Sequence, residues 1–185
     1  MAADTIDIPS WLDIVQCVQE AFDAVRMKKP LPVKNLLQGA GRLISEIQSR
    51  SLVLPVPSST LAVNLKPYAH AVNVAILSLQ VGKILGYNEF MLRDLAVGCL
   101  LHDIGKAATG EDKRHPEAGF AILRSIREIS LLSAHVAFQH HETIGGQGYP
   151  RSIRGNALRA CPCYCTSSFK SSARCSTGLH FSCCL

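Results

Sequence analysis

Residues 99–106 read CLLHDIGK, an apolar run that ends on a histidine and an aspartate and is then stopped by Gly105. A second stretch, FQHHE at residues 138–142, likewise places two adjacent histidines at the end of an apolar segment. Burying such polar side chains is costly unless something compensates their polarity. A metal ion does so, because imidazole nitrogens and carboxylate oxygens suit iron, manganese, zinc or nickel. The two stretches therefore predict helices that end at a metal site.

The other histidines support this prediction. Six of the seven lie between residues 70 and 141, each at an expected helix end or on an inward-facing helix face. Any one of them alone is more often a hydrogen-bonded core residue than a ligand. Adjacent residues on a helix point about 100° apart, so His102–Asp103 and His140–His141 are each expected to serve neighbouring ions. Two ions about 3.5–4 Å apart are the usual apparatus for phosphate ester hydrolysis.

Lys106 has two interpretations. One helical turn past His102, its ammonium group could lie over a substrate phosphate. It could equally complement the negative end of the helix dipole, and spacing alone does not separate the two.

Apolar residues recur at helical spacing on both sides of these stretches, and no sustained alternation predicts strands. The fold class is therefore predicted to be all-α. Prolines or glycines mark three connectors, at residues 52–57, 108–114 and 143–150. The expected helices are 11–25 (capped by Ser10 and followed by Pro30), 36–47, 67–85 (ending on Gly86), 89–103, one opening at 115–116, and 130–141.

Length and composition set outer limits. The chain has 185 residues, of which 48% are hydrophobic and 18% charged, so it suits one compact domain and excludes global disorder. Its net charge of +5 is scattered, which indicates no nucleic-acid stripe and no membrane-surface patch. No secretory signal or membrane span is visible, so a cytoplasmic location is expected. In a reducing compartment Cys17 and Cys99 are expected to be core thiols.

The cysteines are unevenly placed. Six of the eight crowd the last 25 residues, where no aspartate or glutamate occurs. The six are Cys161, Cys163, Cys165, Cys175, Cys183 and Cys184. The composition therefore changes near residue 160, and residues 161–185 are expected to lie outside the fold.

Three motifs occur in order: LLHDIGK at residues 100–106, HPEAG at 115–119 and HHETIGGQGYP at 140–150. Together they resemble the HD superfamily of metal-dependent phosphohydrolases, and specifically its HD-GYP branch. The likeness spans Lys66 to Arg159. It implies an HD-domain-like helical bundle with lead-in helices at residues 1–60, an HD-GYP-like domain at 61–160 and a cysteine-rich tail at 161–185.

The resemblance also implies roles for individual residues. Asp103 would bridge two metal ions, Lys106 would contact the scissile phosphate, and the loop with Gly148 and Tyr149 would border the substrate. The other implied metal ligands are His70, His102, His115, His140 and His141. The implied cofactor is a pair of divalent ions, iron or manganese, with zinc, nickel or magnesium as alternatives.

The family substrate is cyclic di-GMP, opened by a metal-activated water to linear pGpG and in some members on to GMP. The expected partners are this dinucleotide and other signalling domains or proteins, with no DNA or RNA polymer and no membrane. Two alternatives stay open. One is a degenerate regulatory module that binds a partner or nucleotide without turnover, and the other is an HD-type hydrolase of another nucleotide.

The sequence departs from the family pattern at four places. Lys66 replaces a glutamate that serves a third metal, Gly145 replaces a loop aspartate, and the link from Asp103 to His115 is short. Beyond residue 160 the helix that carries the last metal carboxylate is missing, which is expected to lower the activity of this chain. The tail is either a cysteine-rich metal or redox appendage or, as we favour, sequence unrelated to the fold, such as a late reading-frame shift.

Overall fold

The computed structural model describes residues 4–5, 7–57, 61–143 and 145–154, so the cysteine-rich tail lies outside the described residues. It confirms the all-α prediction. The helices are α1 (Ile8–Arg26), α2 (Val33–Ser49), α3 (Lys66–Ile84), α4 (Glu89–Leu100), α5 (Lys106–Thr109), α6 (His115–Arg124) and α7 (Leu131–Gln139), with a 3-10 turn η2 at Val63–Leu65. Two short segments, β1 (Asp4–Thr5) and β2 (Val53–Leu54), pair in parallel with Asp4 opposite Val53. Each segment has only two residues, which is too short to show the alternation of apolar and polar residues that predicts a strand.

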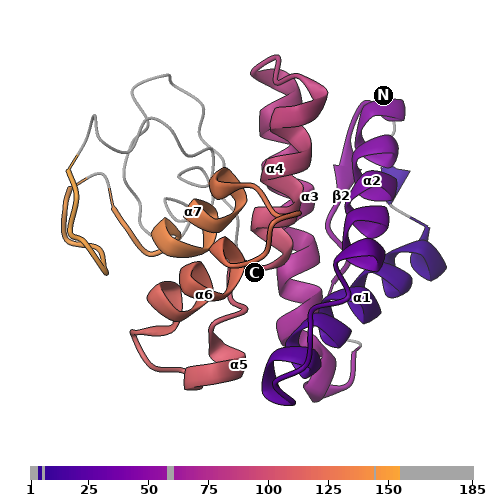
Figure 1. Cartoon of the computed structure of the whole chain (residues 1–185). Coiled ribbons are helices and arrows are strands. Elements are labelled where there is room, and N and C mark those ends of the chain that lie inside the picture. The colour runs from indigo at the N-terminus through magenta and orange to yellow at the C-terminus, as the bar shows by residue number, and fades with distance from the viewer. Residues whose placement is uncertain (1–3, 6, 58–60, 144, 155–185) are drawn as a thin grey trace.

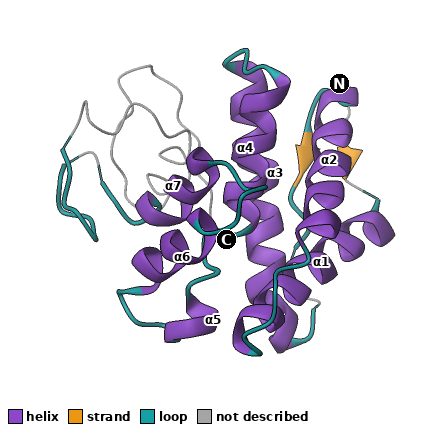
Figure 2. Cartoon of the chain, viewed as in Figure 1, coloured by secondary structure: helices purple, strands orange, loops and turns teal. Residues whose placement is uncertain are grey.

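The helices form two groups on either side of a central hairpin (Figures 1 and 2). The long helices α3 and α4 pack against each other, with α1 and α2 on one side and α6 and α7 on the other. The large side chains that are fully buried come from both groups and from the hairpin. They include Trp11, Ile14, Leu36, Leu43, Ile76, Leu79, Leu95, Leu100 and Leu123. One continuous apolar core therefore supports the ends of α4, α6 and α7.

Several helix boundaries differ from the prediction. Helix α2 is longer than predicted at both ends, and α7 ends at Gln139, two residues before the predicted end. The N-cap of α1 is Asp7, whose carboxylate accepts a hydrogen bond from the Ser10 N–H at 3.2 Å, so Ser10 is not the cap. Helix α4 ends at Leu100, three residues before the predicted end, and His102 and Asp103 lie in the turns that follow. A short helix, α5, begins at Lys106 and includes the first two residues of the predicted polar loop.

Gly105 explains why the chain turns where it does. A Cβ atom at this position would overlap the carbonyl oxygen of His115 and lie 2.6 Å from the backbone nitrogen of Gly119. Only glycine lets the turn after α4 approach the backbone of α6 this closely. The turn that carries Asp103 is thereby held against the helix that carries His115.

The predicted core thiols differ in burial. Cys99 is buried in α4, whereas Cys17 in α1 is only half-buried. Within the described residues, none of the helices combines the length and apolar character needed to cross a membrane.

Candidate metal centre

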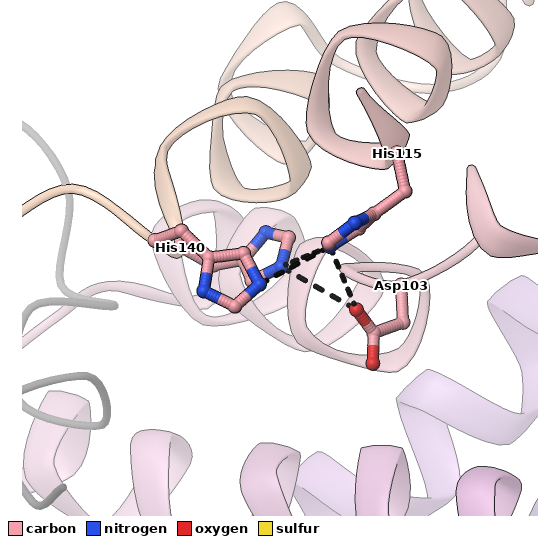
Figure 3. Close-up of side chains that lie close together, drawn as sticks. Asp103, His115 and His140 are labelled. Atoms are coloured by element: carbon pink, nitrogen blue, oxygen red, sulfur yellow. Dashed lines mark hydrogen bonds and ion pairs between the residues drawn. The ribbon is translucent and has the colours of Figure 1, made fainter. Parts of the chain in front are cut away.

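Four predicted ligands meet where three helices begin or end. Asp103 lies in the turn after α4, His115 is the first residue of α6, and His140 and His141 follow the last residue of α7. One potential ligand atom from each lies within 4.8 Å of all the others. Figure 3 shows Asp103, His115 and His140 pointing toward one another.

The nitrogens at the centre of this cluster are unusually close. The Nε2 atom of His115 lies 3.1 Å from Nε2 of His140 and 3.1 Å from Nε2 of His141. The Asp103 Oδ1 atom lies 3.4 Å from Nε2 of His115 and 3.4 Å from Nε2 of His140. The site therefore concentrates three imidazole nitrogens around one carboxylate oxygen.

Three histidines are oriented in the same way, each by a carbonyl three residues earlier. The Nδ1 atom of His102 lies 2.7 Å from the Cys99 oxygen, and that of His115 lies 2.7 Å from the Asp112 oxygen. The corresponding distance from His140 to the Ala137 oxygen is 2.8 Å. A carbonyl only accepts, so each neutral ring carries its proton on Nδ1 and presents a lone pair at Nε2.

This assignment makes the cluster a fitting metal site. With both Nδ1 atoms protonated, Nε2 of His115 and Nε2 of His140 face each other at 3.1 Å with no proton between them. Two lone pairs at that distance repel unless a cation lies among them. An outer carbonyl that fixes the tautomer is also the usual arrangement behind a metal-bound histidine. The residues therefore fit a divalent metal ion.

Burial and neighbouring charges keep His140 and His141 neutral. Burial lowers the pKa of His140 to about 4. Burial, together with the neighbouring His140 and His115, lowers the pKa of His141 to about 3. Burial tends to raise the pKa of Asp103, but the surrounding histidines outweigh it and hold that pKa well below its usual range. At neutral pH Asp103 is therefore ionised and His140 and His141 are neutral, which is the state in which these side chains bind metal.

Asp103 has a second group of residues on its other side. Its Oδ2 atom lies 3.4 Å from Nε2 of His102, whose ring centroid lies 5.6 Å from that of His70. His102 is buried, whereas His70 is exposed. Burial tends to lower the pKa of His102, but the adjacent Asp103 carboxylate raises it overall. Asp103 thus lies between two histidine groups.

Lys106 also reaches this side of Asp103. Its Nζ atom lies 3.0 Å from Asp103 Oδ2 and 3.1 Å from a carboxylate oxygen of Glu111. Since α4 ends at Leu100 and Lys106 opens α5, the lysine does not complement the carboxyl end of α4. The interpretation as a residue complementing the dipole of the preceding helix therefore does not fit, and contact of Lys106 with a substrate phosphate stays a prediction.

The structure groups two of the histidines and separates a third. His140 and His141 both follow the last residue of α7 and belong to one cluster, and the expectation that they serve neighbouring ions stays a prediction. His135 lies outside the cluster, with its ring centroid 5.0 Å from that of Phe120.

The predicted substrate loop borders the cluster. The Tyr149 ring stacks on the His141 ring, with centroids 4.4 Å apart and planes at 15°. Gly148 passes so close to residues 141 and 142 that a Cβ atom there would overlap the His141 carbonyl oxygen.

Sequence reasoning gave no role to two acids near the site. Glu142 is fully buried and accepts hydrogen bonds from the loop, and Glu111 pairs with Lys106. Glu142 directly follows the histidine pair, so its position was a usable signal. Nothing in the local sequence distinguishes Glu111 from other loop acids.

A family model described as HD domain matches residues 68–164. The chain is 33% identical over 133 residues to "Cyclic di-GMP phosphodiesterase PA4108" of Pseudomonas aeruginosa, covering 60% of this chain and 32% of that protein. It is 32% identical over 108 residues to "Cyclic di-GMP phosphodiesterase" of Thermotoga maritima, covering 49% and 29%.

A third relative is "3'3'-cGAMP-specific phosphodiesterase 1" of Vibrio cholerae, 30% identical over 106 residues and covering 49% of this chain and 25% of that protein. The chain thus spans about a third or less of the length of these relatives. No solved structure matches it.

Proposed function

Since this chain belongs to the HD domain family, we propose that it is a metal-dependent phosphodiesterase that opens cyclic di-GMP. The observation that carries the proposal is the convergence of imidazole lone pairs on the Asp103 carboxylate, which a cation would make favourable. Two relatives named cyclic di-GMP phosphodiesterases support the choice of substrate.

The two sides of Asp103 would hold one ion each. The three-histidine side comprises His115, His140 and His141 together with Asp103 Oδ1. The two-histidine side is His70 and His102 together with Asp103 Oδ2. Bound divalent ions supply a nucleophilic water at neutral pH and offset charge on the phosphoryl oxygens. The family resemblance favours iron or manganese. Imidazole nitrogens also suit zinc and nickel, and magnesium, which prefers oxygen ligands, fits these donors least.

The remaining residues would handle the substrate. Burial tends to lower the pKa of Lys106, but the adjacent Asp103 carboxylate raises it overall, so Nζ keeps its proton and can pair with a phosphate oxygen. The Tyr149 ring, stacked on His141, offers an aromatic wall beside the ions. Gly148 lets the backbone reach the site without a side chain in the way.

The sequence also favours a second candidate function. The last 25 residues contain no aspartate or glutamate, so the carboxylate that the family places after the GYP loop has no counterpart there. A chain that lacks this ligand could bind a nucleotide or a partner protein without turnover. Hydrolysis of another cyclic dinucleotide is a third candidate, since one relative is named as specific for 3'3'-cGAMP.

One experiment separates these functions. The purified chain is incubated with Mn²⁺ or Fe²⁺ and with cyclic di-GMP or 3'3'-cGAMP, and the products are resolved by chromatography. We expect turnover of cyclic di-GMP that Asp103→Asn abolishes. Bound nucleotide without product would favour the regulatory module, and preferential cleavage of 3'3'-cGAMP would favour the third candidate. A chain with no metal on elemental analysis would refute the enzymatic proposal.

A further inference from the structure

Glu142 is a buried carboxylate that lies beside the metal centre without facing it. Its side chain is 0% exposed. One oxygen accepts a hydrogen bond from the Arg151 N–H at 2.6 Å, and the other accepts one from the Ile153 N–H at 3.1 Å. Among the described residues it forms no ion pair, so these two backbone groups supply its hydrogen bonds.

The segment that Glu142 holds is the irregular loop around Tyr149. The Tyr149 N–H donates to the His141 carbonyl oxygen at 3.2 Å, and the Ser152 hydroxyl donates to the Gly148 carbonyl oxygen at 2.8 Å. Because Gly148 also lies directly against the Glu142 backbone, residues 148–153 are fixed to residues 141–142 along their length. This loop has no helix or strand, so these contacts define its shape.

His141 depends on this loop more than its neighbours do. His102, His115 and His140 are each oriented by a carbonyl that accepts from Nδ1. For His141 the described part of the chain offers no such carbonyl, and its ring instead lies under the Tyr149 ring at 4.4 Å and 15°. The stack therefore takes the place of the missing hydrogen bond in setting the ring plane.

We propose that Glu142 is a positioning residue for this centre. Its carboxylate fixes residues 148–153, which keep the Tyr149 ring on His141 and so direct His141 Nε2 toward the other ligands. The ligand role of His141 rests on the proposed function, whereas the hydrogen bonds and the stack do not. The first test therefore uses the metal-free chain.

Backbone amide exchange measured by NMR tests the hydrogen bonds directly. In the wild type we expect the amides of Arg151 and Ile153 to exchange slowly, and in Glu142→Gln at least one of them to exchange about tenfold faster or more. Glu128→Gln, which alters an exposed glutamate in the loop before α7, is the matched control and should leave both rates unchanged. Fast exchange of both amides in the wild type would overturn the proposal even if the variant failed to fold.

The ring of His141 gives a second metal-free signal. Stacking under Tyr149 shifts the His141 ring protons upfield, and we expect Glu142→Gln and Tyr149→Ala each to remove that shift. A shift that persists in folded Glu142→Gln would overturn the proposal.

Metal affinity tests the consequence. Groups behind a metal ligand typically contribute 10–100-fold to affinity, so we expect Glu142→Gln to weaken Co²⁺ binding about tenfold. The double variant with Tyr149→Ala should bind no more weakly than the weaker single variant, because both act through His141. Effects of the two substitutions that multiply independently would overturn the proposal.

The failure of this proposal can be distinguished from the failure of the proposed function. If the wild type binds Co²⁺ but hydrolyses nothing, the proposed function fails, and the Co²⁺ and NMR measurements still decide whether Glu142 positions His141. If it binds no Co²⁺, the two NMR measurements decide it.

Discussion

On one side of Asp103, three histidine nitrogens from α6 and the end of α7 converge on its carboxylate. On the other side the described residues bring together buried His102, exposed His70 and the Lys106 ammonium group. The first side is built entirely within residues 103–149, where carbonyls and an aromatic stack fix each ring. The second has two rings from α3 and the turn after α4. Among the described residues, the first side therefore offers more potential metal ligands than the second.

Removing Asp103 should have the largest effect, because both sides use its carboxylate. We expect Asp103→Asn to lower metal affinity on both sides, and turnover with it, by at least about 100-fold, since even groups behind a ligand contribute 10–100-fold. Elemental analysis after dialysis and a cyclic di-GMP assay would measure this. An Asp103→Asn chain that kept two ions would show that Asp103 is not shared.

Single histidine variants should separate the two sides. We expect His140→Ala to weaken the tighter ion about 100-fold, and His70→Ala to leave that ion within about threefold while emptying the weaker position. Mn²⁺ titrations with each purified variant would give both affinities. If both variants lost the same affinity for the tighter ion, the two sides of Asp103 would not be separate metal positions.

Gly105→Ala should disturb the join between the turn and α6. The added Cβ would overlap the His115 carbonyl oxygen, so we expect a loss of about 2 kcal/mol in the free energy of unfolding. The three-histidine side should lose more affinity than the other, because His115 lies at the point of overlap.

Gly41→Ala is the matched control for that variant. Gly41 is an exposed residue of α2 with open space around its Cβ position. The substitution should raise the free energy of unfolding by about 0.5–1 kcal/mol. Chemical denaturation measures both variants, and equal destabilisation by the two would refute the close-approach argument.

The smallest expected effect is a difference between the two sides of Asp103 in how metal affinity depends on pH. The lowered pKa values of His140 and His141, about 4 and about 3, mean that neither takes up a proton between pH 7.5 and 5.5. The raised pKa of His102 means that metal binding there must displace a proton, so affinity on that side should increase with pH by up to about tenfold per unit. Mn²⁺ binding measured across this range would show two slopes, and a single slope for both ions would contradict it.

The sequence predicted much of this arrangement because the relevant signals are local. Apolar spacing located α1 to α4, α6 and α7 within a few residues, and proline and glycine marked their ends. It misplaced the end of α4 because Leu101, His102 and Asp103 continue a helical pattern, while the close approach of Gly105 to α6 ends the helix earlier. Helix α5 was not predicted because its four residues are too few to show helical periodicity in the sequence.

By itself, the sequence determined the fold class, the family and the residue types available to bind metal, since each depends on order and spacing along the chain. The tertiary structure decided which of those residues meet. Packing of α6 and α7 on the hairpin brought His115, His140 and His141 into one cluster and left His135 outside it. It also placed the Glu142 carboxylate against the backbone N–H groups of Arg151 and Ile153. A buried carboxylate needs hydrogen-bond donors, and only the fold decides which groups are close enough to donate.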